Sequence, residues 1–120
     1  MGKETYHEKL ERLIDNYIHS VYDESESFPK SEQFGARSQL RRSALSVMLN
    51  YKEGYARQSS GDLRRFLKIS YGSLKESEYL VEFAKKRGWI ERSEADQLIS
   101  MCDQIGKMLW GVINNADSGN

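Results

Sequence analysis

The sequence predicts an all-α protein, an antiparallel up-and-down four-helix bundle, and three observations lead to this prediction. Apolar residues recur at spacings of three and four in four separate segments, which is the periodicity of amphipathic helices. The connections between these segments are short, so consecutive helices should be antiparallel neighbours. The composition, 38% hydrophobic and 30% charged, suits slender elements with a high ratio of surface to volume. We therefore expect one domain over residues 1–120 and no strands.

The first helix is expected over residues 5–22, where one face is apolar and the other is charged. The segment Asp23–Ser27 is acidic and serine-rich and has no periodicity, so we expect it to end this helix. The apolar face carries Tyr6, Leu10, Leu13, Ile14, Tyr17, Ile18, Val21 and Tyr22.

The second helix is expected over residues 32–56, after the only proline of the chain. Pro29 disfavours helical dihedrals for the residue before it, so Ser31 is the expected N-cap. Two neighbouring apolar stripes cover a wider arc than packing against one neighbour requires. This predicts burial on more than one side, by several bundle partners or by another subunit. The stripes contain Phe34, Arg41, Leu45, Met48 and Tyr55, and Leu40, Ala44, Val47 and Tyr51.

The third helix is expected over residues 62–87, with Ser59 and Asp62 in an arrangement that resembles a capping box. Gly72 costs about 1 kcal/mol relative to alanine in a helix interior. We therefore expect a close helix–helix approach at that glycine. Three cations precede Gly88, which suits the left-handed position at the end of a helix.

The fourth helix is expected over residues 92–114, starting between Glu91 and Ser93, and the polar residues after it are expected to fray. Its apolar face carries Ala95, Leu98, Ile99, Cys102, Ile105, Leu109, Val112 and Ile113.

The charge balance and the cysteine count limit the classes of protein to consider. Lys+Arg and Asp+Glu both number 18, whereas nucleic-acid-binding proteins usually have an overall basic balance. A single cysteine excludes an intrachain disulfide and favours a reducing compartment. The charged start of the chain lacks the apolar core of a signal peptide, and no apolar run is long enough to cross a bilayer. We expect a cytoplasmic protein with no membrane partner.

No catalytic, cofactor or metal site is predicted, nor is a small-molecule substrate. A di-iron bundle needs two Glu-x-x-His motifs, but only Glu4 and His7 match, because His19 follows Asn16 at that spacing. Cys102 falls on an apolar face, where a free cysteine usually behaves as a small hydrophobe. No phosphate-binding glycine loop or nucleophile elbow is present. We therefore expect a protein that is not an enzyme.

The charged residues of the second and third helices have two interpretations. Arginine is costly to bury unless it is paired, so the first is a polar network between helices or between subunits. Its candidates are Arg41, Arg42, Glu53, Glu76 and Glu78. The second is a basic strip that contacts the phosphates of RNA or DNA. Its candidates are Arg37, Arg41, Arg64, Arg65 and Lys68. The nearby Phe34 and Phe66 fall on apolar stripes, and we expect them in the core rather than stacked on bases.

A set of short motifs extends along most of the chain. It comprises Phe28-Pro29-Lys30, Phe34-Gly35, Ser38-Gln39-Leu40-Arg41-Arg42-Ser43-Ala44, Asn50, Glu53-Gly54-Tyr55, Phe66-Leu67-Lys68-Ile69-Ser70, Gly72-Ser73-Leu74-Lys75-Glu76-Ser77-Glu78, Gly106-Lys107-Met108-Leu109 and Gly111-Val112-Ile113.

This combination resembles the bacterial four-helix-bundle proteins related to the 23S rRNA intervening-sequence protein. The resemblance implies a bundle that assembles as a homopentamer and whose biochemical role is not established. The chain is also similar to accessory proteins of diversity-generating retroelements, which bind a reverse transcriptase and nucleic acid. Those proteins are typically strongly basic, and the neutral balance here argues against that subgroup.

Two functions follow as expectations. The first is a non-enzymatic oligomeric scaffold or interaction module, acting with copies of itself and with RNA or a ribonucleoprotein component. The alternative is direct binding of RNA or DNA by the basic strip.

Overall fold

The computed structural model describes residues 2–118, which form four helices and one 3₁₀ turn and include no strand. The elements are α1 (Tyr6–Ser25), the 3₁₀ turn η1 (Lys30–Glu32), α2 (Ala36–Ala56), α3 (Ser60–Arg87) and α4 (Arg92–Ser118). The predicted all-α, four-helix architecture is therefore confirmed. No helix in these residues combines the length and the apolarity needed to span a membrane.

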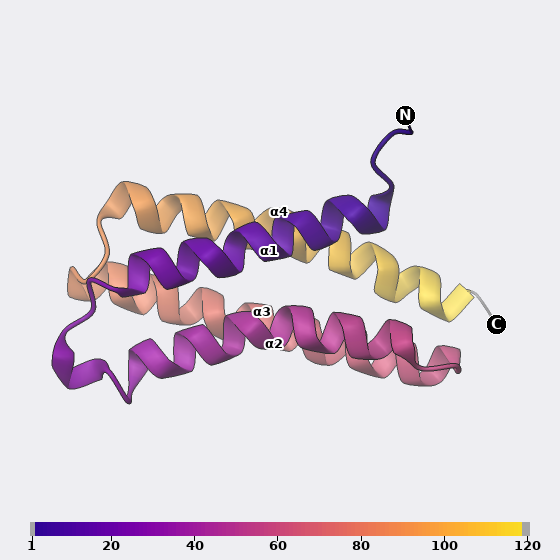
Figure 1. Cartoon of the computed structure of the whole chain (residues 1–120), viewed down its shortest axis with the longest axis horizontal. Coiled ribbons are helices and arrows are strands. Elements are labelled where there is room, and N and C mark those ends of the chain that lie inside the picture. The colour runs from indigo at the N-terminus through magenta and orange to yellow at the C-terminus, as the bar shows by residue number, and fades with distance from the viewer. Residues whose placement is uncertain (1, 119–120) are drawn as a thin grey trace.

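The helices alternate in direction along an elongated bundle of 47 × 32 × 20 Å (Figure 1). Each helix packs against the helices before and after it, and α1 also packs against α4. Helices α2 and α3 form one layer, and α1 and α4 form the other (Figure 1). Both ends of the chain lie at the end of the bundle where α2 turns into α3, and η1 lies at the opposite end (Figure 1).

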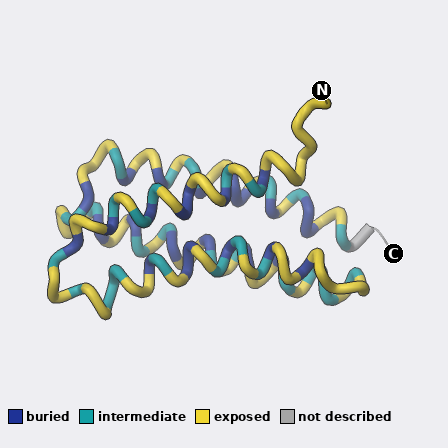
Figure 2. The backbone as a smooth tube through the Cα atoms, viewed as in Figure 1, coloured by how far each residue is buried: buried dark blue, intermediate teal, exposed yellow. Residues whose placement is uncertain are grey.

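The core runs along the inside of the bundle, and all four helices contribute to it (Figure 2). The inward faces follow the spacings of three and four that predicted the helices, because only one face of each helix can be buried. The largest side chains that are almost fully buried include Tyr17, Tyr51, Leu74, Leu98 and Leu109.

Helix α1 ends at Ser25, within the segment Asp23–Ser27 that was expected to end it but three residues beyond the expected bound of 22. Ser25 is fully buried, and its hydroxyl accepts a hydrogen bond from Arg41 Nε at 2.7 Å. A contact with α2 thus holds a turn that has little helical pattern of its own. Helix α4 likewise extends four residues beyond its expected end at 114, whereas α3 begins two residues before its expected start.

The prediction that α2 begins at residue 32 with Ser31 as its N-cap is also wrong. Ser31 lies within η1, and α2 begins only after Gly35. The Glu32 carboxylate accepts a hydrogen bond from the Ala36 backbone N–H at 3.1 Å, where a negative charge complements the helix dipole. Phe34 therefore precedes the helix, so helical periodicity does not place it. It is 90% exposed, and its predicted burial in the core is wrong.

The α2–α3 contact contains the close approach that was expected at another glycine. A Cβ on Gly54 would lie 3.1 Å from Phe66 Cβ and 3.3 Å from the Leu63 carbonyl oxygen. A Cβ on Gly72 would meet nothing within 4 Å, so the expectation of a tight contact there is wrong. The predicted cap of α3 is confirmed, because the Ser59 hydroxyl accepts a hydrogen bond from the Asp62 backbone N–H at 3.1 Å.

The predicted left-handed end of α3 is confirmed at Gly88, whose φ is 76°. The Trp89 and Gly88 N–H groups donate to the carbonyl oxygens of Ala84 and Lys85, at 2.9 and 3.0 Å, which is the Schellman pattern. This turn places Trp89 against the rings of Phe28 and Phe83.

Gly88→Ala should lower the free energy of unfolding by about 1 to 2 kcal/mol, because a Cβ is strained at this φ. Gly61→Ala is the matched control, since Gly61 has no positive φ and a Cβ there would meet nothing within 4 Å. Urea titrations of the two variants should show a lower midpoint for Gly88→Ala only. Equal stability of the two variants would contradict the role of Gly88.

Candidate interaction surfaces

Arg41 is the arginine that falls among apolar positions of α2, and it binds the end of α1. Its Nε donates to the Ser25 hydroxyl, and its Nη2 donates to the Tyr22 carbonyl oxygen at 2.9 Å and to Glu26 Oε1 at 2.9 Å. Its guanidinium also lies 4.5 Å from the centre of the Tyr22 ring. Arg41 is therefore a structural link between two helices within one chain.

Glu26 is shared by two arginines at this corner. Arg37 Nη2 lies 2.7 Å from the Glu26 Oε1 atom that also accepts from Arg41. The hydrogen bond from Arg41, together with the charge of Arg37, lowers the pKa of Glu26 below its ordinary value. The first interpretation required a partner for Arg41, and within the chain that partner is the end of α1.

The other residues of the predicted polar network are not joined to Arg41 within the chain. Glu53 pairs at 3.0 Å with Arg57, the residue after α2, and Glu78 pairs at 3.3 Å with Lys75 of α3. In residues 2–118, neither Arg42 nor Glu76 has an ion-pair partner. A network of these side chains between subunits stays a prediction.

The five residues of the predicted basic strip fall into two groups at opposite ends of the α2–α3 hairpin. Arg37 and Arg41 lie at the corner with α1, whereas Arg64, Arg65 and Lys68 line a hollow of about 610 Å³ near the start of α3. Because the helices are antiparallel, about 13 helical residues separate the two levels, or roughly 20 Å at 1.5 Å per residue. Within one chain the two groups do not form a continuous strip.

Phe66, the second aromatic residue near the predicted strip, is half-buried. Two guanidinium groups lie near its ring, that of Arg57 at 4.9 Å and that of Arg65 at 4.5 Å from the ring centre. Both distances fit cation–π contacts, and the Cβ of Phe66 lies close to Gly54 of α2.

The α2–α3 hairpin carries most of the large apolar side chains that remain exposed in the described residues. Nine such side chains are exposed, and seven of them belong to α2, to α3 or to the turn before α2. We call Phe34, Leu45 and Leu49 the α2 patch, and Ile69, Tyr79 and Phe83 the α3 patch. The sequence reasoning overlooked Leu49, Ile69, Tyr79 and Phe83. The signal was present, because these apolar residues lie off the stripes that form the core.

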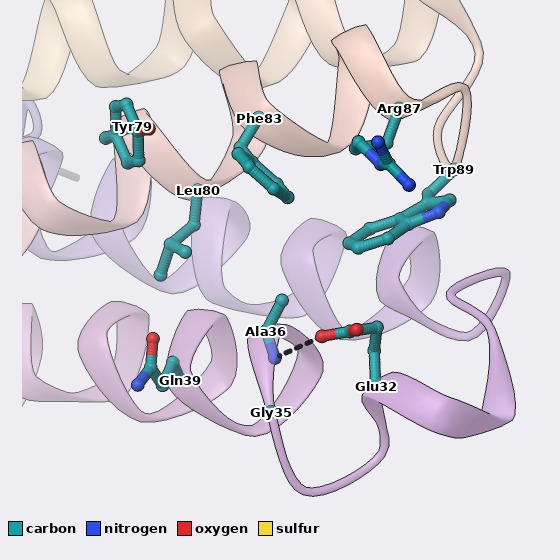
Figure 3. A pocket seen from close by; sticks show the side chains of 9 residues that line it. All are labelled: Glu32, Gly35, Ala36, Gln39, Tyr79, Leu80, Phe83, Arg87 and Trp89. Carbon is teal, nitrogen blue, oxygen red and sulfur yellow. Dashed lines mark hydrogen bonds between the residues drawn. The ribbon is translucent and has the colours of Figure 1, made fainter.

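A hollow of about 360 Å³ lies between the start of α2 and the end of α3 (Figure 3). Tyr79, Phe83 and Trp89 form its aromatic side, and Glu32, Gly35 and Gln39 lie across from them (Figure 3). Phe34 does not line this hollow, although the next residue in the chain, Gly35, does. It lines a different hollow, which faces α1 and includes Tyr22 and Arg37.

Cys102 is buried, and this burial raises the pKa of its thiol to about 12, so the thiolate is scarce near neutral pH. His7 Nδ1 forms a hydrogen bond with the Tyr51 hydroxyl, at a distance of 2.6 Å. In residues 2–118, no group of three or more His, Cys, Asp or Glu side chains is placed to hold a metal ion.

Comparison with known proteins gives a family and a fold. The family model described as 23S rRNA-intervening sequence protein matches residues 13–111. A solved protein of unknown function from the S23 ribosomal protein family of Bacteroides thetaiotaomicron superimposes with a TM-score of 0.80. The two chains are 21% identical, and the match covers 87% of this chain and 97% of the other. At that identity the likeness concerns the fold alone. No curated protein matches the chain.

Proposed function

Because this chain belongs to the 23S rRNA-intervening sequence protein family, as its motifs predicted, we propose that it is a cytoplasmic, non-enzymatic structural subunit that assembles with copies of itself. The proposed assembly is the homopentamer that the sequence resemblance implies. Association with RNA or a ribonucleoprotein component is part of the same proposal and is supported by the description of the family.

The distribution of exposed apolar side chains carries this proposal. The α2 and α3 patches lie on two neighbouring helices, whereas Tyr6 and Trp110 are the large apolar side chains exposed on α1 and α4 among the described residues. An apolar surface gathered on one part of a small domain is typical of a protein–protein contact. The wide apolar arc of α2 agrees with burial by a second chain as well as by the bundle core.

Leu49→Glu should dissociate the assembly into single chains. Leu49 is 64% exposed, so a charge is tolerated in the free subunit but would be buried without a partner in the assembly. Asn16→Glu adds the same charge to an exposed position of α1 and should leave the assembly intact. Size-exclusion chromatography with light scattering measures the mass of each form.

The wild-type mass should approach five times the 13.9 kDa of one chain, and circular dichroism should show that Leu49→Glu keeps its helices. A wild-type protein that stays monomeric at micromolar concentration would refute self-assembly.

The alternative, direct binding of RNA or DNA along one basic strip, gains no support from the geometry. The cations lie in two groups, and the chain has no net positive charge. Binding to ribosomal RNA fragments that weakens steadily as salt rises would favour this alternative, since phosphate contacts release counterions.

A further inference from the structure

Phe34 stands out because a well-defined turn presents it to solvent. Within that turn the Gln33 N–H donates to the Lys30 carbonyl oxygen at 3.1 Å, and the Gly35 N–H donates to the Glu32 carbonyl oxygen at 3.0 Å. The ring is 90% exposed, the largest exposure of the large apolar side chains described. A large aromatic side chain held on an ordered corner has the features of a binding hot spot, because little entropy is lost when it is covered.

The hollow between α2 and α3 has the size and chemistry to receive such a ring. Its volume of about 360 Å³ exceeds the ~150 Å³ of an apolar cavity that accepts benzene. Tyr79, Phe83 and Trp89 offer aromatic edges and faces to a fourth ring. Trp89 is itself fixed by Phe28 and Phe83, whose ring centres lie 5.2 and 5.7 Å away, so this wall is already formed.

One chain cannot fill its own hollow without breaking the turn that holds Phe34. Glu32 and Gly35 line the hollow, whereas Phe34 faces the hollow on the α1 side. The projecting ring and the aromatic hollow therefore lie on two different faces of the bundle. A contact that joins two different faces is heterologous, and it produces a ring when the rotation between copies closes.

Residues of the α2 side and of the α3 side also lie at the same heights along the bundle axis. Ser46 bonds to Ser73 at 2.8 Å, and the Ser70 hydroxyl donates to the Val47 carbonyl oxygen at 2.7 Å. These bonds fix the register of the antiparallel pair. In an antiparallel pair, each step forward along α2 corresponds to a step back along α3. Counted from these bonds, Arg42 lies at the same height along the bundle as Glu76, and Leu49 lies at the same height as Ile69.

In a ring whose axis runs parallel to the bundle, residues at one level of neighbouring copies meet. We propose that the α2 patch of one copy packs on the α3 patch of the next, with Phe34 inserted between Tyr79, Phe83 and Trp89. Arg42 then pairs with Glu76, and Leu49 packs on Ile69. The contact supplies an ion-pair partner for two charges that have none among residues 2–118. This inference rests on the self-assembly proposed above and specifies its interface.

Two single variants remove opposite halves of this contact. Phe34→Ala removes the inserted ring and keeps the hollow, whereas Tyr79→Glu spoils the hollow and keeps the ring. Both positions are exposed, at 90% and 64%, so both subunits should fold. Each variant alone should dissociate at a protein concentration at least about tenfold higher than wild type, as expected for a hot spot. Gln33→Ala, at an exposed position of the same turn, should assemble like wild type.

An equimolar mixture of the two variants gives the sharpest result. The intact ring of the Tyr79→Glu copy fits the intact hollow of the Phe34→Ala copy. The two faces left over are both altered, so a further copy binds them more weakly than this contact. Native mass spectrometry should therefore show a complex of one copy of each variant. Arg42→Glu and Glu76→Arg should each weaken assembly, and the double variant should restore it.

The outcomes separate this inference from the proposal on which it rests. If wild type assembles and Phe34→Ala assembles equally well, the insertion of Phe34 is refuted while self-assembly stands. If the mixed variants stay monomeric, the heterologous contact is refuted. If wild type itself is monomeric, both proposals fall.

Discussion

Replacing Tyr17 with alanine is expected to lower the free energy of unfolding by about 3 to 5 kcal/mol, the range for deleting a large aromatic side chain from a core. Tyr17 is fully buried, and its hydroxyl lies 2.8 Å from the Ser77 hydroxyl. The Ser77 hydroxyl donates its own proton to the Leu74 carbonyl oxygen at 2.8 Å. Tyr17 must therefore be the donor to Ser77. Alanine would leave both a cavity and an unfilled acceptor in the middle of the bundle.

Tyr17→Phe separates these two contributions. Phenylalanine keeps the ring and loses only the hydroxyl, so it should cost about 1 kcal/mol, the usual net contribution of one hydrogen bond. Urea titration with linear extrapolation gives both values. The titrations should be repeated at several protein concentrations, because assembly would add to the apparent stability. A cost for Tyr17→Ala no larger than that for Tyr17→Phe would contradict the packing role of the ring.

Arg41→Ala is expected to lower the free energy of unfolding by about 2 to 3 kcal/mol, because it leaves polar atoms at the end of α1 without their donor. The bonds to the Ser25 hydroxyl and the Tyr22 carbonyl oxygen should account for most of this loss. The pair with Glu26 should contribute little, since the Glu26 side chain is 66% exposed. Calorimetry or urea titration measures the change.

The neighbouring arginine provides the matched control. Arg42 makes no ion pair in the described residues, so Arg42→Ala should alter subunit stability by no more than about 0.5 kcal/mol. Arg41→Lys should recover only part of the loss, because one ammonium group cannot reproduce a planar fork of donors. Equal effects of Arg41→Ala and Arg42→Ala would remove the structural role assigned to Arg41.

The sequence was most informative where local chemistry decides the structure. The cap at Ser59 and the left-handed Gly88 were both predicted, because each depends on a few consecutive residues. The end of α1 was placed three residues too early because the buried Ser25 is held by Arg41, sixteen residues away in the chain. The tight glycine was misplaced for a similar reason. Whether Gly54 or Gly72 is crowded depends on which helix faces it.

The predicted site residues illustrate the same limit. The position of Arg41 among apolar residues correctly signalled the need for a partner. Periodicity within α2 gave no means of choosing between the end of α1 and a glutamate of α3. The basic strip appeared continuous only because its members lie on consecutive helices. Antiparallel packing places Arg37 and Arg65 at opposite ends of the hairpin.

The position of the chain ends has a consequence for the proposed ring. Both ends lie at the α2–α3 turn, whereas η1 lies at the opposite end (Figure 1). Phe34 lies between η1 and the start of α2 in the chain. Copies related by an axis parallel to the bundle all point the same way. Every amino and carboxyl terminus would therefore emerge on a single rim, leaving the other rim free of them. A protein fused to either terminus would be displayed once per subunit on one side of the ring, away from Phe34.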